Sequence, residues 1–137
     1  MDTSPQPELF STICGLIIDD DRFSRSFIKT ALLQIGIKNV KEATNADEAR
    51  EILNNFPINI ILLDQIMPEQ SGTEFVKQVK QNESQLLDNI PIIMITVDTQ
   101  EKTVLDAKRP GIKEYLVKPI SPSALKQRII NALMTKN

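Results

Sequence analysis

The sequence predicts an α/β domain, a doubly wound, five-stranded parallel sheet with helices on both faces. Three features indicate this fold. Five short apolar segments, rich in β-branched residues, alternate with five segments of helical periodicity. The central apolar segment, residues 58–63, is hydrophobic enough to be buried on both faces of a sheet. Each return to a parallel neighbour requires a crossover, which the helical segments supply.

The expected strands are short and are bounded by proline, glycine or polar residues. Pro68 forces a turn soon after the third strand. Pro91 lies near the start of the fourth, where a missing N–H is tolerated, and Pro119 closes the fifth. In chain order, we expect strands at residues 13–18, 39–43, 58–63, 90–96 and 114–118.

The helical segments have recognisable caps and stops. The first is expected at residues 21–35, ended by Gly36, with an apolar face of residues four apart: Phe23, Phe27, Ala31 and Ile35. Asn45 is the expected cap of the second helix, and Ser121 that of the last, which runs almost to Asn137. The others are expected at residues 73–82 and 100–108, with a loop at 86–89.

Composition excludes several classes of function. Residues 1–11 are expected to be a flexible leader and residues 12–137 a single domain. The net charge of −2, without a basic run, argues against direct nucleic-acid binding. The chain shows neither a membrane span nor a signal peptide, so we expect a cytoplasmic protein without membrane insertion. Because histidine is absent, histidine triads, histidine metal sites and a histidine phosphocarrier are excluded.

Polar side chains follow several of the expected strands. They are Asp19–Asp21, Asp64, Thr96 and Lys118. The carboxyl ends of parallel strands meet at one edge of a sheet, so these groups should share one shallow cleft. Neighbouring carboxylates repel one another, and a divalent cation with oxygen ligands, Mg²⁺ above all, relieves that repulsion. With a hydroxyl and an ammonium beside them, one carboxylate could attack a phosphoryl group.

Taken singly, each of these residues also has a structural interpretation. Asp19–Asp21 could cap the helix that follows and interact with its dipole. Thr96 could simply end a strand, and Lys118 could be a solvated surface lysine. Their joint arrival at one edge of the sheet favours the functional interpretation.

The residues at these strand ends resemble the motifs of the receiver domain of two-component response regulators. The resemblance covers about residues 15–134. Four motifs carry it, in order: Leu16-Ile17-Ile18-Asp19-Asp20-Asp21; Leu62-Leu63-Asp64-Gln65-Ile66-Met67-Pro68 with Gly72; Met94-Ile95-Thr96; and Tyr115-Leu116-Val117-Lys118-Pro119. It implies a CheY-like single-domain receiver with a flavodoxin-like (βα)5 fold and strand order 2-1-3-4-5.

The resemblance also implies a role for each site residue. Asp64 would be the phosphoacceptor, and Mg²⁺ would be held by Asp19, Asp20, Asp64 and the backbone carbonyl of Ile66. Thr96 and Lys118 would hold phosphoryl oxygens, and the Lys118–Pro119 peptide bond would be cis. On phosphorylation, Thr96 and Tyr115 would move inward and remodel the face made by the fourth helix, the fifth strand and the fifth helix. From its own position, Tyr115 could equally be a half-buried strand tyrosine.

A receiver of this kind is a switch that catalyses its own phosphorylation and dephosphorylation, not a turnover enzyme. The donor would be a histidine kinase or a histidine phosphotransfer protein, and the output would be control of a downstream protein. Whether phosphorylation drives a homodimer through the last two helices stays open. Two departures from the family pattern bear on switching: Val97 after the threonine, and Arg109-Pro110-Gly111-Ile112 before the fifth strand. Gln65, Ile66 and Asp98 flank the site at positions that vary within the family, and we expect them to tune the lifetime of the phosphoryl group.

Two other classes of function remain. Asp19 and Asp21 have the Asp-x-Asp spacing of haloacid-dehalogenase-like phosphatases, in which the first aspartate is the nucleophile. That class leaves the Asp64 turn without a role, and the chain has no evident cap domain or later acidic pair. The other class is a receiver-like interaction module that does not use phosphorylation. Such modules usually lack one of the acids, the threonine or the lysine, all of which are present here.

Overall fold

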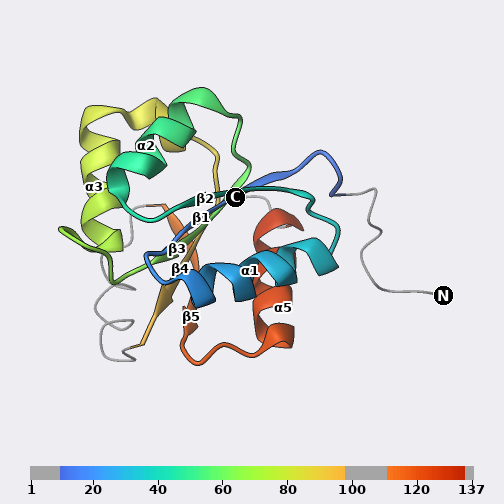
Figure 1. The fold of residues 1–137 in the computed structure, drawn as a ribbon. Helices are drawn as coiled ribbons and strands as arrows, with labels where there is room; N and C mark the ends of the chain where they lie inside the picture. Colours follow the sequence, from blue (N-terminus) through green and yellow to red (C-terminus); the bar gives the residue numbers. More distant parts are fainter. Residues whose placement is uncertain (1–9, 98–110, 135–137) are drawn as a thin grey trace.

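The computed structural model describes residues 10–97 and 111–134. Its sheet has five parallel strands in the order β2-β1-β3-β4-β5, which confirms the predicted fold (Figure 1). The second strand has the expected bounds, whereas the third to fifth begin two residues later or earlier. The strands are β1 (Cys14–Ile18), β2 (Asn39–Ala43), β3 (Ile60–Asp64), β4 (Ile92–Thr96) and β5 (Ile112–Val117).

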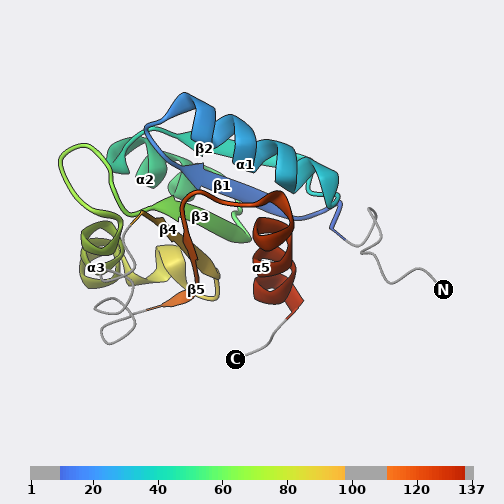
Figure 2. The ribbon, with the colours of Figure 1, turned by 90° about the horizontal axis from the view of Figure 1, so that it is seen from below.

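Helices cover both faces of the sheet, with α2 and α3 on one and α1 and α5 on the other (Figure 2). The helix expected at residues 100–108 lies outside the described residues. A 3-10 turn, η2 (Ser84–Leu87), replaces the first part of the loop expected at 86–89, because this segment is only long enough for one tight turn. The α-helices are α1 (Arg22–Gln34), α2 (Ala46–Asn55), α3 (Gly72–Asn82) and α5 (Pro122–Met134).

The apolar face predicted for α1 is wrong in its first half. Phe23 is 82% exposed and Phe27 is 39% exposed. Residues four apart drift by about 40° per step around a helix, so a stripe of three such steps turns away from the sheet. The buried face instead follows mixed intervals of three and four: Ile28, Ala31, Leu32 and, just after the helix, Ile35.

The predicted caps are confirmed. Asn45 Oδ1 accepts a hydrogen bond from the Glu48 N–H at 2.8 Å, and Ser121 Oγ accepts one from the Ala124 N–H at 3.1 Å. Gly36 has φ = 105°, a left-handed conformation that glycine adopts without strain. These local signals therefore set where α1 ends and where α2 and α5 begin.

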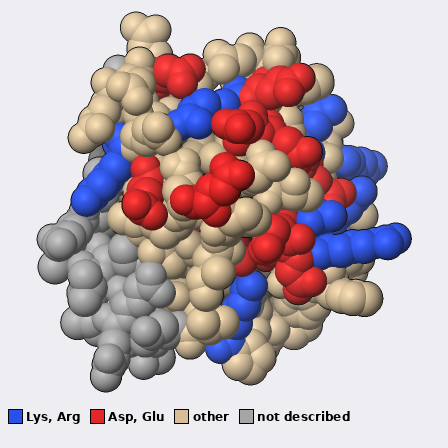
Figure 3. Space-filling model, turned by 60° about the vertical axis from the view of Figure 1, so that its left-hand side comes forward, with Lys and Arg blue, Asp and Glu red and all other residues tan. Residues whose placement is uncertain are grey.

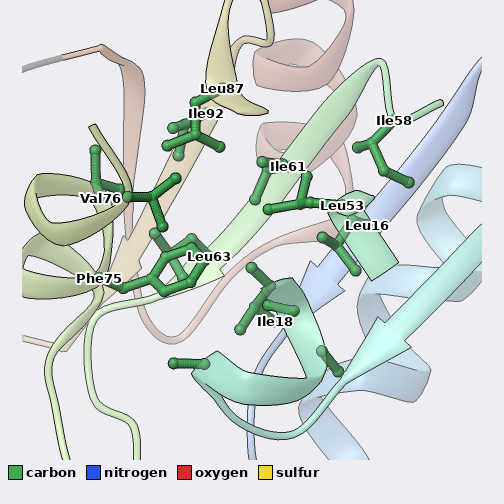
Figure 4. Packing of buried hydrophobic residues seen from close by; sticks show 14 of the residues in the cluster. Leu16, Ile18, Leu53, Ile58, Ile61, Leu63, Phe75, Val76, Leu87 and Ile92 are labelled. Carbon is green, nitrogen blue, oxygen red and sulfur yellow. The ribbon is translucent and has the colours of Figure 1, made fainter. Parts of the chain in front are cut away.

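Two hydrophobic clusters lie on opposite faces of the sheet because successive strand residues point in opposite directions. The cluster beneath α2 and α3 includes Leu16, Ile61, Leu63 and Phe75 (Figure 4). The cluster beneath α1 and α5 contains the alternate strand residues, such as Ile17, Leu62 and Ile95. Phe10, which falls in the predicted leader, is 3% exposed and packs in this second cluster.

The register between β4 and β5 shifts by one residue near their start. Ile92 lies opposite Ile112, but Ile93 lies opposite Glu114, so β5 contributes one residue more than β4. After the shift, Met94 lies opposite Tyr115 and Thr96 opposite Val117. Tyr115 consequently joins the cluster beneath α2 and α3, and Leu116 the opposite one.

Surface charge contributes little to this fold. On the face shown in Figure 3, acidic side chains are interspersed with basic ones. Neighbouring elements are joined by partly exposed ion pairs, such as Arg50–Glu83 at 3.5 Å and Arg128–Glu114 at 3.1 Å. Pairs of this kind are worth about 0–1 kcal/mol each. No helix in the described ranges has the length and hydrophobicity that crossing a membrane requires.

We predict that Phe75→Ala lowers the free energy of unfolding by about 3–5 kcal/mol, because Phe75 is fully buried and its truncation leaves a cavity. Phe23→Ala is the matched control, and its effect should stay within about 0.5 kcal/mol, since Phe23 is exposed. Urea unfolding of both variants measures the difference. Equal destabilisation by the two substitutions would contradict the packing described here.

Candidate functional site

Three carboxylates gather at the C-terminal edge of the sheet. Asp19 follows β1 directly and Asp64 is the last residue of β3. One carboxylate oxygen from each of Asp19, Asp20 and Asp64 lies within 4.8 Å of the others. Asp19 is 1% exposed and Asp64 is 6% exposed, whereas Asp20 is exposed. The topology thus brings together acids that are far apart in the sequence, with Asp20 on the solvent side.

Asp21 has a different role from the two acids before it. Its carboxylate accepts hydrogen bonds from the N–H groups of Phe23 and Ser24, each at 3.3 Å, and so caps α1. Its own N–H donates to Asp19 Oδ1 at 2.8 Å. The two interpretations of the acidic run both hold, for different residues. Asp21 caps the helix, and Asp19 and Asp20 belong to the carboxylate cluster.

Lys118 places an ammonium group between the buried acids. It follows β5, and its Nζ lies 3.5 Å from Asp64 Oδ2 and 3.6 Å from Asp19 Oδ2. Its side chain is only 22% exposed, so it is not the solvated surface lysine of the structural interpretation. The peptide bond between Lys118 and Pro119 is cis. The site therefore contains a cation already directed at both carboxylates.

The environment of Asp64 makes it a weaker acid than usual. Burial, and next the charge of Asp19, raise its pKa from 3.8 to about 6, although Lys118 and a hydrogen bond from the Ile66 N–H at 3.3 Å act in the opposite direction. The carboxylate is thus ionised at neutral pH but poorly hydrated. An anion of this kind is suited to bind a cation or to attack an electrophile.

The cluster has the ligands that a divalent metal ion requires. Carboxylate oxygens are hard ligands, and three of them converge within one coordination sphere. Asp19 Oδ2 is buried and accepts no hydrogen bond from the described residues, although the Lys118 ammonium lies 3.6 Å away. A buried anionic oxygen without a donor is destabilising. The residues present therefore fit a bound cation.

Thr96 and Tyr115 lie on the face of the sheet that α2 and α3 cover, and Thr96 directly follows Ile95, which pairs with Asp64. Thr96 ends β4 and is fully buried, and Tyr115 is 6% exposed. Met94 lies opposite Tyr115 and precedes Thr96 by two residues, so the three side chains share a face. Tyr115 is thus buried in the core cluster, which differs from the half-buried position that its strand alone suggested.

Arg25 is a site residue that the sequence reasoning missed. Its Nη1 donates to the backbone carbonyl of Asp19 at 2.9 Å, and its Nε to Glu42 Oε1 on β2 at 3.1 Å. Arg25 thus links α1 and β2 to Asp19, one of the three acids of the carboxylate cluster. No sequence signal identifies this contact, because the carbonyl of Asp19 carries no side-chain chemistry.

Gln65 is also buried, 5% exposed, and its side chain is hydrogen-bonded to Thr73. Close to it, Ser71 and Glu74 form a reciprocal capping box at the start of α3. The Ser-x-x-Glu spacing could have revealed this box in the sequence. The residue that follows Asp64 is therefore part of the structure around the site and not only a flanking position.

We predict that Asp64→Asn raises the free energy of unfolding in metal-free buffer at pH 7.5. The pKa of Asp64 is about 6 in the fold and 3.8 ordinarily, so the folded chain binds this proton more tightly than the unfolded chain does. Its stabilising contribution is therefore lost as the pH rises from about 4 through about 6. Asparagine does not titrate, so the variant's advantage should grow across that window to about 1–3 kcal/mol.

Urea unfolding at pH 4.5 and 7.5 in the presence of a chelator tests this prediction. Asp88→Asn is the control, because Asp88 is exposed, and it should change stability by less than about 0.5 kcal/mol at either pH. If Asp64→Asn were no more stable than wild type at pH 7.5, that result would contradict the raised pKa of Asp64.

Comparisons with known proteins agree with this geometry. A family model described as the response regulator receiver domain matches residues 16–130. The chain is 35% identical over 123 residues to the chemotaxis protein CheY1 of Helicobacter pylori, covering 89% of this chain and 98% of that protein. It is 34% identical over 121 residues to a chemotaxis protein CheY homolog of Campylobacter jejuni, with 88% and 92% covered. The solved structure of CheY4 of Vibrio cholerae superposes with a TM-score of 0.77 at 28% identity, with 88% and 98% covered.

Proposed function

Because the chain belongs to the response regulator receiver family, we propose that it is a signalling switch that accepts a phosphoryl group onto Asp64. One observation carries the proposal. Asp64 is an ionised, poorly hydrated carboxylate whose Oδ2 lies 3.5 Å from the ammonium of Lys118, within a cluster that fits a cation. A nucleophile and the charges that stabilise phosphoryl transfer are thus at one place.

The transfer follows from the groups present. A carboxylate oxygen of Asp64 attacks phosphorus, forming the O–P bond as the N–P bond to the donor's phosphohistidine breaks. The electron pair of that bond stays on the imidazole nitrogen. Mg²⁺, when bound, neutralises charge on the phosphoryl oxygens. Asp19, Asp20, Asp64 and the Ile66 carbonyl would hold it. Later attack of water on phosphorus releases inorganic phosphate and restores the carboxylate.

Lys118 and Thr96 would hold the transferred group. In the structure, the Lys118 ammonium partly neutralises the negative charges of Asp64 and Asp19. A phosphoryl group on Asp64 would offer this ammonium a more highly charged partner. Thr96 would donate its hydroxyl, and its inward movement would be followed by Tyr115. The two share a sheet face through Met94, which supports this coupling. The expected output is a change of the face formed by the fourth helix, β5 and α5, which controls a downstream protein.

The surface beside the site suits a protein as phosphoryl donor. Phe23 is exposed at the N-terminal end of α1. Contact with water does not stabilise its apolar ring, so a partner protein that covered the ring would bury apolar surface. Next to Phe23, an apolar depression of about 250 Å³ is lined by Phe27, Ile28, Pro119 and Ile120 and begins at Lys118. A histidine kinase or histidine phosphotransfer protein could bury these groups while presenting its phosphohistidine to Asp64. The switch would act in the cytoplasm, where such donors phosphorylate their targets.

The haloacid-dehalogenase-like alternative is disfavoured by Asp21. In that mechanism the second acid of the Asp-x-Asp pair transfers protons, but both carboxylate oxygens of Asp21 accept N–H groups of α1. Asp19 Oδ1 is in turn occupied by the Asp21 N–H. The phosphorylation-independent module remains the second candidate, and the next experiment separates it from the switch.

We predict that wild type gains one phosphoryl group by intact mass after incubation with Mg²⁺ and acetyl phosphate. Asp64→Asn should gain none. Lys118→Gln should react slower by a factor of about 100 or more, because a charge-stabilising donor is lost. Asp47→Asn, at an exposed position on α2, is the control and should react like wild type. An unmodified wild type that also fails to bind beryllofluoride with Mg²⁺ would indicate the phosphorylation-independent module instead.

A second prediction concerns the donor. Phe23→Ala should leave phosphorylation by acetyl phosphate unchanged and slow transfer from a phosphorylated histidine phosphotransfer domain by about tenfold, because an aromatic anchor of the interface is lost. The two rates are measured with the same preparation, using a domain that transfers to wild type. Phe56→Ala, another exposed phenylalanine, is the control. Equal transfer rates for Phe23→Ala and wild type would exclude this docking surface.

A further inference from the structure

The side chain of Gln65 lies on the opposite face of the sheet from Asp64. Leu62 packs beneath α1 and α5 and Leu63 beneath α2 and α3, so the alternation along β3 directs Asp64 to the first face and Gln65 to the second. Gln65 is 5% exposed. A buried amide is stable only when it is hydrogen-bonded, so its partners define its role.

Gln65 is bonded to the start of α3 at two levels. Its Oε1 accepts from both the N–H and the Oγ1 hydroxyl of Thr73, each at 2.9 Å. Its backbone carbonyl accepts from the Gly72 N–H at 2.8 Å. Its own N–H donates to the Ile95 carbonyl on β4 at 2.8 Å. We call the side-chain contact between Gln65 and Thr73 the clamp. It joins the end of the sheet directly to the first turn of a helix.

The clamp closes a loop of six residues, 66–71, that borders the carboxylate cluster. The first of them, Ile66, donates its N–H to Asp64 Oδ1 at 3.3 Å. At the other end, the start of α3 packs closely against the backbone of Asp64, because a Cβ added at Gly72 would lie 2.8 Å from the Asp64 carbonyl oxygen. The position of the loop, and with it the Ile66 backbone, is therefore fixed at both ends near Asp64.

We propose that Gln65, through Thr73, is a positioning residue that holds loop 66–71 ready to receive the metal ion. This rests on the proposed function, in which the Ile66 carbonyl is a ligand. Without the clamp, two donors of Thr73 lose their acceptor and the loop gains freedom that cation binding must then remove. The clamp thus raises metal affinity although Gln65 touches neither the ion nor the phosphoryl group.

Gln65→Met tests the proposal, because methionine has a similar length but no strong acceptor. Mg²⁺ affinity, measured by calorimetric titration, should fall by about tenfold, as when a group that supports a metal ligand is removed. In the metal-free protein, hydrogen exchange of the amides in 66–71 should become faster, whereas that of the β1 amides should not. Both readouts are independent of phosphorylation activity.

Thr73 supplies the matched pair of variants, also useful if Gln65→Met folds poorly. Thr73→Ser keeps both donors and should bind Mg²⁺ like wild type. Thr73→Val loses the hydroxyl donor and should weaken binding and speed exchange in 66–71, by less than Gln65→Met does. Normal Mg²⁺ affinity and loop exchange in both Gln65→Met and Thr73→Val, with only a lower melting temperature, would overturn the clamp while leaving the proposed function intact. A wild type without Mg²⁺ affinity would overturn the proposed function and the clamp's role with it.

Discussion

Two carboxylates, Asp19 and Asp64, are buried beside one another and face the ammonium of Lys118. This electrostatic constraint governs the C-terminal edge of the sheet. Burial of Asp64, and next its repulsion by Asp19, raise the pKa of Asp64 to about 6, and Lys118 offsets these effects only in part. Such an arrangement persists because the packed strands on either side do not allow the acids to separate. Burying like charges side by side costs stability, and costs of this kind are common at functional sites.

The residues of the site lie on both faces of the sheet. Asp64 and Lys118 extend the rows of residues that pack beneath α1 and α5, so the charges meet on that side. Thr96 and Tyr115 extend the rows beneath α2 and α3, as does Gln65. The charged groups and the uncharged residues around them thus approach the edge of the sheet from opposite faces. Strand alternation alone creates this division.

Much of the fold could be predicted because its determinants are local. Apolar strands, caps such as Asn45 and Ser121, and Gly36 each act through neighbours in the sequence, and the parallel topology follows from their alternation. The gathering of Asp19, Asp20 and Asp64 was predictable for the same reason, since parallel strands align their ends. Local patterns thus suffice wherever a residue's role depends on its strand or helix.

What the sequence did not reveal depends on three-dimensional packing. The inward face of α1 was misplaced because a four-residue interval fits a helix only over short stretches, and nothing local marks Phe23 as exposed. Arg25 bonds a backbone carbonyl, and Gln65 bonds a helix eight residues later, so neither contact has a residue-type signature. Asp21 could be assigned as a cap and separated from its acidic neighbours only by its hydrogen bonds.

The one-residue register shift between β4 and β5 has a consequence for how this chain can vary. Pairing counted onward from Ile92 and Ile112 without the shift would set Tyr115 opposite Ile95 and reverse every later side chain of β5. Tyr115 would then point beneath α1 and α5, and Lys118 would turn away from Asp64. The register shift takes up the extra residue of β5 and so keeps Tyr115 and Lys118 on the faces of the sheet that the site requires. A single-residue deletion between Ile112 and Tyr115 would therefore leave the lysine and the tyrosine in place, because regular pairing onward from Ile92 and Ile112 would then set Tyr115 opposite Met94 without a shift.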